Sequence, residues 1–200
     1  MKYIYLIIAL FIAVVPAMAD KKGGQILDEM SSAIDAIGSY EVSFEVVSGG
    51  RVVASGEYIV DRDLYKLSIA DQEIYGDSKS RFTIDNRLRE IIMESIDSSI
   101  PMVVANPARA FKGLSKSFDS KIVEQSDNIT IALTPRKESD IIDSALLEID
   151  TTTKLPILVR YEADGEQITV RILDLHKSSI SLVSLEELVL PDGYDIIDVR

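Results

Sequence analysis

The chain offers few side chains suited to catalysis. His176 is its only histidine and stands beside Lys177 at the end of an alternating segment, where an ordinary surface role is the simpler interpretation. The sequence contains no nucleophile elbow, glycine-rich phosphate loop, zinc-protease helix or calcium loop. The acidic residues Asp28, Asp195 and Asp198 are better explained as solvated charges than as metal ligands. We therefore expect a protein that is not an enzyme and that uses neither metal nor cofactor.

One cation stands in an unusual position. Arg62 follows Tyr58 and Val60 at a spacing of two, and this spacing places it on the same face of a predicted strand as those apolar residues. A guanidinium group at the edge of an apolar face needs hydrogen-bond acceptors, because burying it without them costs free energy. An enzyme would need a cluster of such polar groups, and here the sequence offers only Arg62 and tyrosines.

The acceptors for Arg62 could come from helix ends, whose last carbonyl groups have no partner within the helix. We hypothesise that Arg62 is a latch that holds the first helix and the segment 100–112 as a lid over the sheet. Ligand entry would then break those bonds. The alternative is a surface ion pair of Arg62 with Asp61 or Asp63.

The elements that would position these groups begin with residues 40–69. Three runs, 40–46, 52–62 and 64–69, alternate apolar and polar residues, and Gly49-Gly50 and Arg62-Asp63 join them. Such alternation with short turns predicts an antiparallel meander with one apolar face. Extended to the next hairpin, that face predicts a lipid-binding cavity lined by Phe44, Tyr58, Val60, Tyr65, Leu67, Phe82 and Ile84.

Two segments could cover this face. Residues 25–37 carry one apolar stripe at helical spacing and end at Gly38, so they predict a helix that either packs in the core or lies across the open side of the sheet. Residues 95–117 lack a strand period, and Asn106-Pro107 is typical of a helix start. This segment is either a flap or a connection packed over the core. The predicted lid residues are Met30, Ile34, Met102, Val104 and Phe111.

Further alternating runs follow residue 121, the last over residues 185–190. Roughly ten strands with short turns and two helices predict a mainly β, α+β fold built on one large, curved antiparallel sheet. Residues 1–19 combine Lys2, an apolar run and an A-x-A ending, which predicts a cleaved signal peptide and a single domain over residues 20–200. A net charge of −12 makes nucleic acid an improbable partner.

In series, several short segments resemble the LolA family of periplasmic lipoprotein carriers. They are residues 39–44, 56–65, 75–79, 154–156 and 190–198. The resemblance implies an unclosed antiparallel half-barrel with helices over a concave apolar face, and Arg62 matches the arginine that latches the lid in that family. It also implies a shuttle that takes acylated lipoproteins from an inner-membrane ABC-type releasing complex to an outer-membrane acceptor, in the periplasm of a Gram-negative bacterium.

Some features depart from that family. The chain has no tryptophan, is unusually acidic and has Ser78 where the family has a glycine. It also has no cysteine, which argues against the lipid-anchored acceptor that shares the fold. Two alternatives stay open: a carrier or sensor of another envelope lipid, and an interaction module whose cavity is filled by its own side chains. We expect a monomer.

Overall fold

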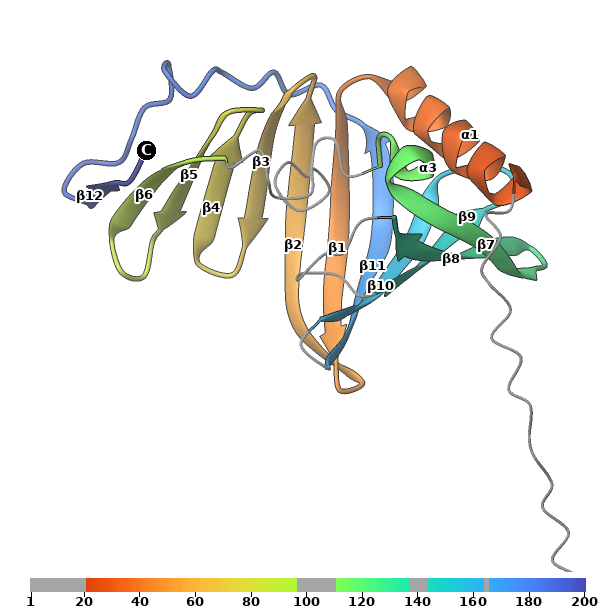
Figure 1. Ribbon diagram of the computed structural model, residues 1–200. Helices are drawn as coiled ribbons and strands as arrows, with labels where there is room; N and C mark the ends of the chain where they lie inside the picture. Colours follow the sequence, from red (N-terminus) through yellow and green to blue (C-terminus); the bar gives the residue numbers. More distant parts are fainter. Residues whose placement is uncertain (1–20, 97–110, 137–143, 164–165) are drawn as a thin grey trace, which may run out of the picture.

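The computed structural model describes residues 21–96, 111–136, 144–163 and 166–200. Within these ranges the chain forms twelve strands and two helices (Figure 1). The predicted signal peptide lies outside them. In chain order the elements are α1 (Lys21–Ile37), β1 (Tyr40–Ser48), β2 (Arg51–Asp61), β3 (Leu64–Ile69), β4 (Gln72–Gly76), β5 (Ser80–Asp85), β6 (Glu90–Ser95), α3 (Leu114–Ser117), β7 (Phe118–Gln125), β8 (Asn128–Pro135), β9 (Ser144–Asp150), β10 (Pro156–Ala163), β11 (Glu166–Lys177) and β12 (Asp195–Asp198).

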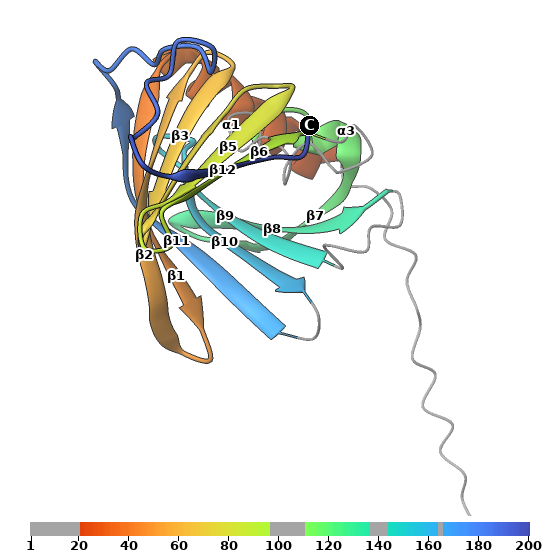
Figure 2. The same ribbon diagram turned by 90° about the vertical axis from the view of Figure 1, so that its left-hand side faces the viewer.

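All twelve strands belong to one sheet in the order β12-β6-β5-β4-β3-β2-β1-β11-β10-β9-β8-β7. The pairing of β12 with β6 is parallel, and the other pairings between described strands are antiparallel. The sheet curves strongly but does not close into a barrel (Figure 2). Its two edge strands, β12 and β7, are the ends of the strand order and do not pair with each other. The predicted unclosed, mainly antiparallel sheet with few helices is confirmed.

The predicted meander is also confirmed, since β1 pairs with β2 and β2 pairs with β3. Its first turn uses Gly49 and Gly50, both with positive φ, the region that glycine adopts without strain. Its second turn places Arg62 at a φ of 60°. The first strand, β1, lies in the middle of the sheet because its other neighbour is β11.

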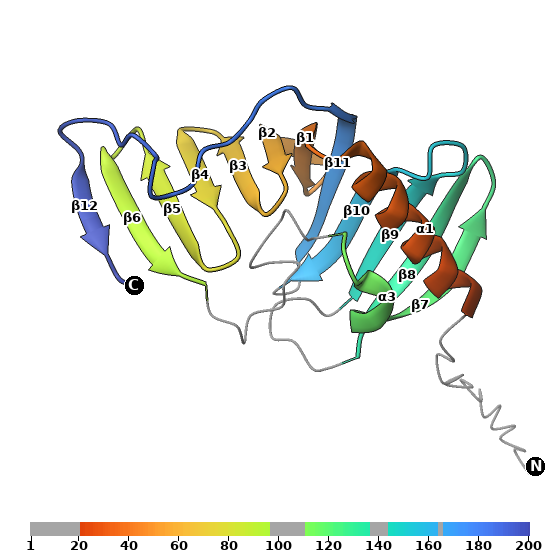
Figure 3. The ribbon, with the colours of Figure 1, turned by 90° about the horizontal axis from the view of Figure 1, so that it is seen from above.

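Helix α1 lies on the concave side of the sheet, beside β7 and α3 (Figure 3). It begins by Lys21, so it includes residues 21–24, which precede the helix predicted over residues 25–37. Gly23 allows the close approach, since a Cβ there would lie 2.9 Å from the Ser120 side-chain oxygen of β7. The apolar stripe of α1 is buried through Ile26, Leu27, Met30 and Ile34.

Apolar side chains gather on both sides of the sheet. The side that faces α1, the inner face, carries a core made by α1 with residues from β1–β3 and β7–β9. The opposite side, the outer face, carries a smaller core of Phe82, Ile84, Ile91 and Met93. Residues directly opposite each other in an antiparallel pair share a face. The pairs Lys66↔Tyr75 and Tyr75↔Phe82 therefore place Phe82 opposite to the face of Tyr65 and Leu67.

A long irregular segment covers the outer core. We call residues 178–194 the strap; it leaves the end of β11 and crosses the sheet on the side away from α1 (Figure 3). Leu185, Leu188, Leu190 and Tyr194 pack against the outer core. The strand predicted over residues 185–190 is therefore wrong, because these residues cover a sheet face and form no strand of the ladder.

Candidate functional site

The inner face has a closed part and an open part. Under α1, the side chains of β8 and β9, such as Ile131 and Leu147, are fully buried. Further along the sheet, apolar side chains of the same face are only partly buried: Phe44, Leu67, Ile74, Val159, Tyr161 and Ile172. An apolar surface of this kind, on a concave sheet, is suited to hydrocarbon chains.

A pocket of about 380 Å³ opens where the end of α1 meets the β2–β3 turn. Its apolar walls include Tyr40 and Val60, and its rim carries two ion pairs. Lys112 Nζ lies 2.8 Å from Asp35 Oδ1, and Arg62 Nε lies 3.5 Å from Asp61 Oδ1. The pocket thus has an apolar base and a charged mouth.

Asp61 is the best-connected group at this mouth. Its Oδ1 accepts a hydrogen bond from the Ser39 hydroxyl at 2.7 Å, and its Oδ2 accepts one from the Leu182 backbone N–H at 3.2 Å. The pKa of Asp61 is held below its ordinary value, chiefly by the hydrogen bond from Ser39. The Leu182 N–H and the positive charge of Arg62 lower it further. This carboxylate thereby joins the start of β1, the end of β2 and the strap.

Arg62 does not lie on the inner face of β2, and that part of the prediction is wrong. The strand ends at Asp61, the backbone of Arg62 takes the left-handed conformation of a turn, and the side chain is 82% exposed. The ion pair with Asp61, the alternative weighed from the sequence, is present. Arg62 nevertheless lines the same pocket as Gly38, at the end of α1, so the latch stays a prediction.

The other predicted site residues divide into three groups. Phe44, Tyr58, Val60, Tyr65 and Leu67 lie in or against the inner core together with Met30, Ile34 and Phe111. Phe82 and Ile84 do not; their assignment to the cavity is wrong, because they form the outer core under the strap. Met102 and Val104 lie outside the described residues, so their place in a lid stays a prediction.

Two tyrosines at the centre of the inner face keep polar atoms in this apolar setting. The ring centroids of Tyr58 and Tyr65 are 6.0 Å apart. Burial, with the neighbouring Tyr40 and Tyr65, raises the pKa of Tyr58 well above 10, and burial raises the pKa of Tyr65 to about 12. Both hydroxyls are therefore protonated at neutral pH and can donate hydrogen bonds.

Several contributors to the site were missed by the sequence reasoning. Ile74, Val159, Tyr161 and Ile172 extend the open inner face. A signal was present for Val159, Tyr161 and Ile172, since each lies in an alternating run, but alternation alone does not say which face points inward. Leu182, whose N–H binds Asp61, gave no signal.

The described residues hold no group of three or more histidine, cysteine, aspartate or glutamate side chains placed to bind a metal ion. In the same ranges no helix combines the length and the apolar character needed to cross a bilayer. His176 lies on the surface, with its Nδ1 2.9 Å from Asp174 Oδ2.

Comparison with known proteins informs the fold. No protein-family model matches the sequence, and no curated protein matches it significantly. Among solved structures, an uncharacterized conserved protein from Thermus thermophilus matches with a TM-score of 0.62 at 6% identity, over 89% of this chain and 99% of that chain. The same fold is therefore used by a sequence that shares almost no residues with this one.

The MucA/MucB complex of Pseudomonas aeruginosa matches with a TM-score of 0.50 at 17% identity, over 88% of this chain and 63% of the other. A LolA superfamily protein from Nitrosomonas europaea matches with a TM-score of 0.40 at 11% identity, over 78% of this chain and 94% of that chain. At these identities the first two show a shared fold and nothing finer.

Proposed function

We propose that this protein is a carrier that binds acyl chains on the open part of its inner face. The observation that carries the proposal is the row of partly exposed apolar side chains there, including Phe44, Leu67 and Ile74, beside a pocket with a charged mouth. Each methylene buried contributes about 0.8 kcal/mol. A chain that covers even part of this surface would therefore bind firmly.

The finer proposal follows the sequence resemblance to lipoprotein carriers. The cargo is an acylated lipoprotein, taken from an inner-membrane ABC-type complex and passed to an outer-membrane acceptor. Residues 1–19 would direct the chain to the periplasm of a Gram-negative bacterium. Residues 20–200 would act there as a single-domain monomer, without nucleic acid, metal or catalysis.

The test is native mass spectrometry of residues 20–200, alone and after mixing with a triacylated lipoprotein. The matched control is the same lipoprotein without its acyl chains. We expect a one-to-one complex with the acylated form only. Co-purified phospholipid or glycolipid, with no lipoprotein complex, would keep the acyl-binding site and change the cargo. A protein that takes up neither would contradict the carrier proposal.

The latch is tested on the same complex. If Arg62 holds a lid closed in the empty protein, removing its charge favours the ligand-bound state. Arg62→Leu should then slow release of the lipoprotein to acceptor membranes, while its urea midpoint stays close to that of the wild type, because an exposed ion pair adds little stability. An unchanged release rate would remove the latch.

The second candidate function is binding of a protein partner. It is favoured by the likeness to the Pseudomonas aeruginosa MucA/MucB complex, in which a chain of this fold is found with another protein. The native spectra separate the two: a partner protein would bind with or without acyl chains, whereas a carrier depends on them.

A further inference from the structure

Three polar atoms on the inner face are buried without a hydrogen-bond partner among the described residues. They are the hydroxyl oxygens of Tyr58 and Tyr65 and the Nε of Arg81. Tyr65 is 2% exposed and Tyr58 is 9% exposed, so bulk solvent does not reach their hydroxyls. Buried polar groups are nearly always paired, because leaving one unpaired costs free energy. Three such groups together indicate that something else pairs with them.

The sheet places these atoms in one neighbourhood. Tyr65 lies directly opposite Gly76, and Gly76 lies directly opposite Arg81 on the next strand. The Tyr65 ring lies over Gly76, where a Cβ would come within 2.3 Å of a ring carbon. The ring thus extends across β4 toward Arg81, whose positive charge opposes the rise in the pKa of Tyr65. Tyr58 adjoins the same ring from β2.

The charge of the donor groups around Tyr58 and Tyr65 indicates which kind of hydrogen-bond acceptor a ligand would bring. The two hydroxyls are neutral donors, and the charge of Arg81 is offset by its ion pair with Glu94. An ionised carboxylate or phosphate would find no net positive charge there, so desolvating it would not be compensated. A neutral acceptor such as a carbonyl oxygen has no such cost. Apolar side chains surround the donors, so the carbonyl should be joined to hydrocarbon.

We propose that the hydroxyls of Tyr58 and Tyr65 donate hydrogen bonds to the ester or amide carbonyls that join acyl chains to their head group, with Arg81 Nε as a third donor. This inference rests on the proposed acyl-binding function and deepens it. It makes the protein selective for acyl chains over plain alkyl chains, and it fixes how deep a chain sits on the inner face.

The test compares a diacyl ester phospholipid with its dialkyl ether analogue of equal chain length, and a triacylated lipopeptide as a second carbonyl source. Each is titrated against a bound apolar fluorophore. The variants are Tyr58→Phe, Tyr65→Phe and the double variant. Tyr75→Phe is the matched control, because its hydroxyl lies on the outer face and is bonded to Glu73.

We expect the wild type to prefer ester over ether, and each inner-face variant to lose about three- to tenfold of that preference, the range of one net hydrogen bond. Affinity for the ether should stay unchanged in every variant, as should ester binding by Tyr75→Phe. If only the lipopeptide shows the preference, its carbonyls are the acceptors.

Two results would overturn the proposal. Equal ester-to-ether ratios in the wild type and the double variant would remove the hydroxyls from recognition while leaving acyl binding in place. Failure of all three lipids to bind would reject the proposed function itself. Stability gives a second readout: without ligand, Tyr58→Phe and Tyr65→Phe should unfold at urea concentrations no lower than the wild type, because an unpaired hydroxyl is removed. A loss of stability would show that the hydroxyl was already paired.

Discussion

Asp61 and Arg62 are adjacent in the sequence but differ in how far each side chain is buried and bonded to the rest of the fold. The carboxylate is buried and bonded to Ser39, just before β1, and to the strap, whereas the guanidinium is largely exposed in a turn. The residue that drew attention in the sequence was the arginine. The residue that holds the mouth of the pocket together is the aspartate beside it.

Asp61→Asn should weaken the fold in a pH-dependent way. The pKa of Asp61 is lowered in the folded state, so its contribution is fully present above its unfolded value of about 3.8 and is lost as the pH falls through the folded value. At pH 7 we expect a loss of about 1–2 kcal/mol, typical of a hydrogen-bonded carboxylate. Urea unfolding from pH 7 down to pH 2 measures it.

The two unfolding curves should converge as the pH falls from about 3.8 through the lowered folded-state pKa of Asp61, where the wild-type carboxylate becomes protonated. Asp174→Asn is the control, because its side chain is exposed and should change stability by less than about 0.5 kcal/mol. A difference between wild type and Asp61→Asn that stays constant down to pH 2 would contradict the assigned cause.

The sequence could not place Arg62, for a physical reason. A spacing of two assigns a face only while the chain stays extended. The backbone turns at Arg62 itself, with φ of 60°, so the alternation that holds for Tyr58 and Val60 stops at Asp61. The turn over Arg62-Asp63 was readable from the sequence, and it should have overruled the extrapolation.

At the scale of elements, alternation predicted the strands well and their faces less well. The β1–β3 meander has short turns, so its face carries over from strand to strand. Between Leu67 and Phe82 the chain makes two further turns, one through Ala70 in the left-handed region, which alanine rarely adopts. One residue more or less in either turn exchanges the faces. That is why Phe82 and Ile84 were assigned to the wrong side.

Helix α1 provides a matched pair of variants. Gly23 faces Ser120 of β7, whereas a Cβ on Gly24 would meet nothing within 4 Å. Gly24→Ala should stabilise the protein by about 0.5–1 kcal/mol, because alanine is the better helix former. Gly23→Ala should lose that gain, because its Cβ would lie 2.9 Å from Ser120 Oγ and 3.3 Å from Ser120 Cβ, so that Ser120 or the helix must shift. Thermal unfolding monitored by circular dichroism compares them.

Equal and favourable effects at both glycines would mean that α1 is not seated against β7. Exposure of the inner core can be followed in the same samples with an apolar dye. Gly23→Ala should raise dye binding, since α1 covers the closed part of that face.

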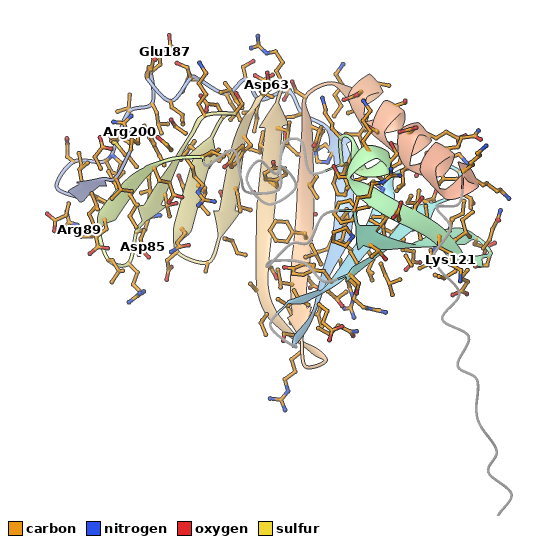
Figure 4. All side chains as sticks on the ribbon, viewed as in Figure 1. Asp63, Asp85, Arg89, Lys121, Glu187 and Arg200 are labelled. Atoms are coloured by element: carbon orange, nitrogen blue, oxygen red, sulfur yellow. The ribbon has the colours of Figure 1, made fainter. Side chains whose placement is uncertain are left out.

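At the scale of the molecule, the sheet separates two cores, one beside the candidate ligand surface and one on the opposite face. The inner core is shared by α1 and the candidate site, and the outer core is covered by the strap. Figure 3 shows α1 and the strap on opposite sides of the sheet. Figure 4 shows Arg200, Arg89 and Asp85 at the β6–β12 end, far from α1. There the Arg200 guanidinium lies 5.5 Å from the centroid of the Phe82 ring. A change in the outer core should therefore alter stability without altering the ligand surface.

Adjacent strap residues test this separation. Leu188 packs against the outer core, whereas Val189 is 90% exposed. Leu188→Asp should cost about 2–3 kcal/mol by placing a charge against apolar side chains, and Val189→Asp should stay within about 0.5 kcal/mol of the wild type. Acyl-chain affinity, measured where both variants are folded, should match the wild type. A weaker affinity in Leu188→Asp would show that the two faces are coupled.

The position of the strap near the end of the sequence also determines when the outer core can be covered during folding. Strands β1–β6 are successive neighbours, so they can pair with one another before the rest of the chain is in place. Their outer face has no cover until residues 178–194 are made, and β6 has no outer neighbour until β12 arrives. Between the synthesis of Met93 and that of the strap, the chain thus displays Phe82, Ile84, Ile91 and Met93 to its surroundings. A chain cut short before the strap would be a target for chaperones or proteases.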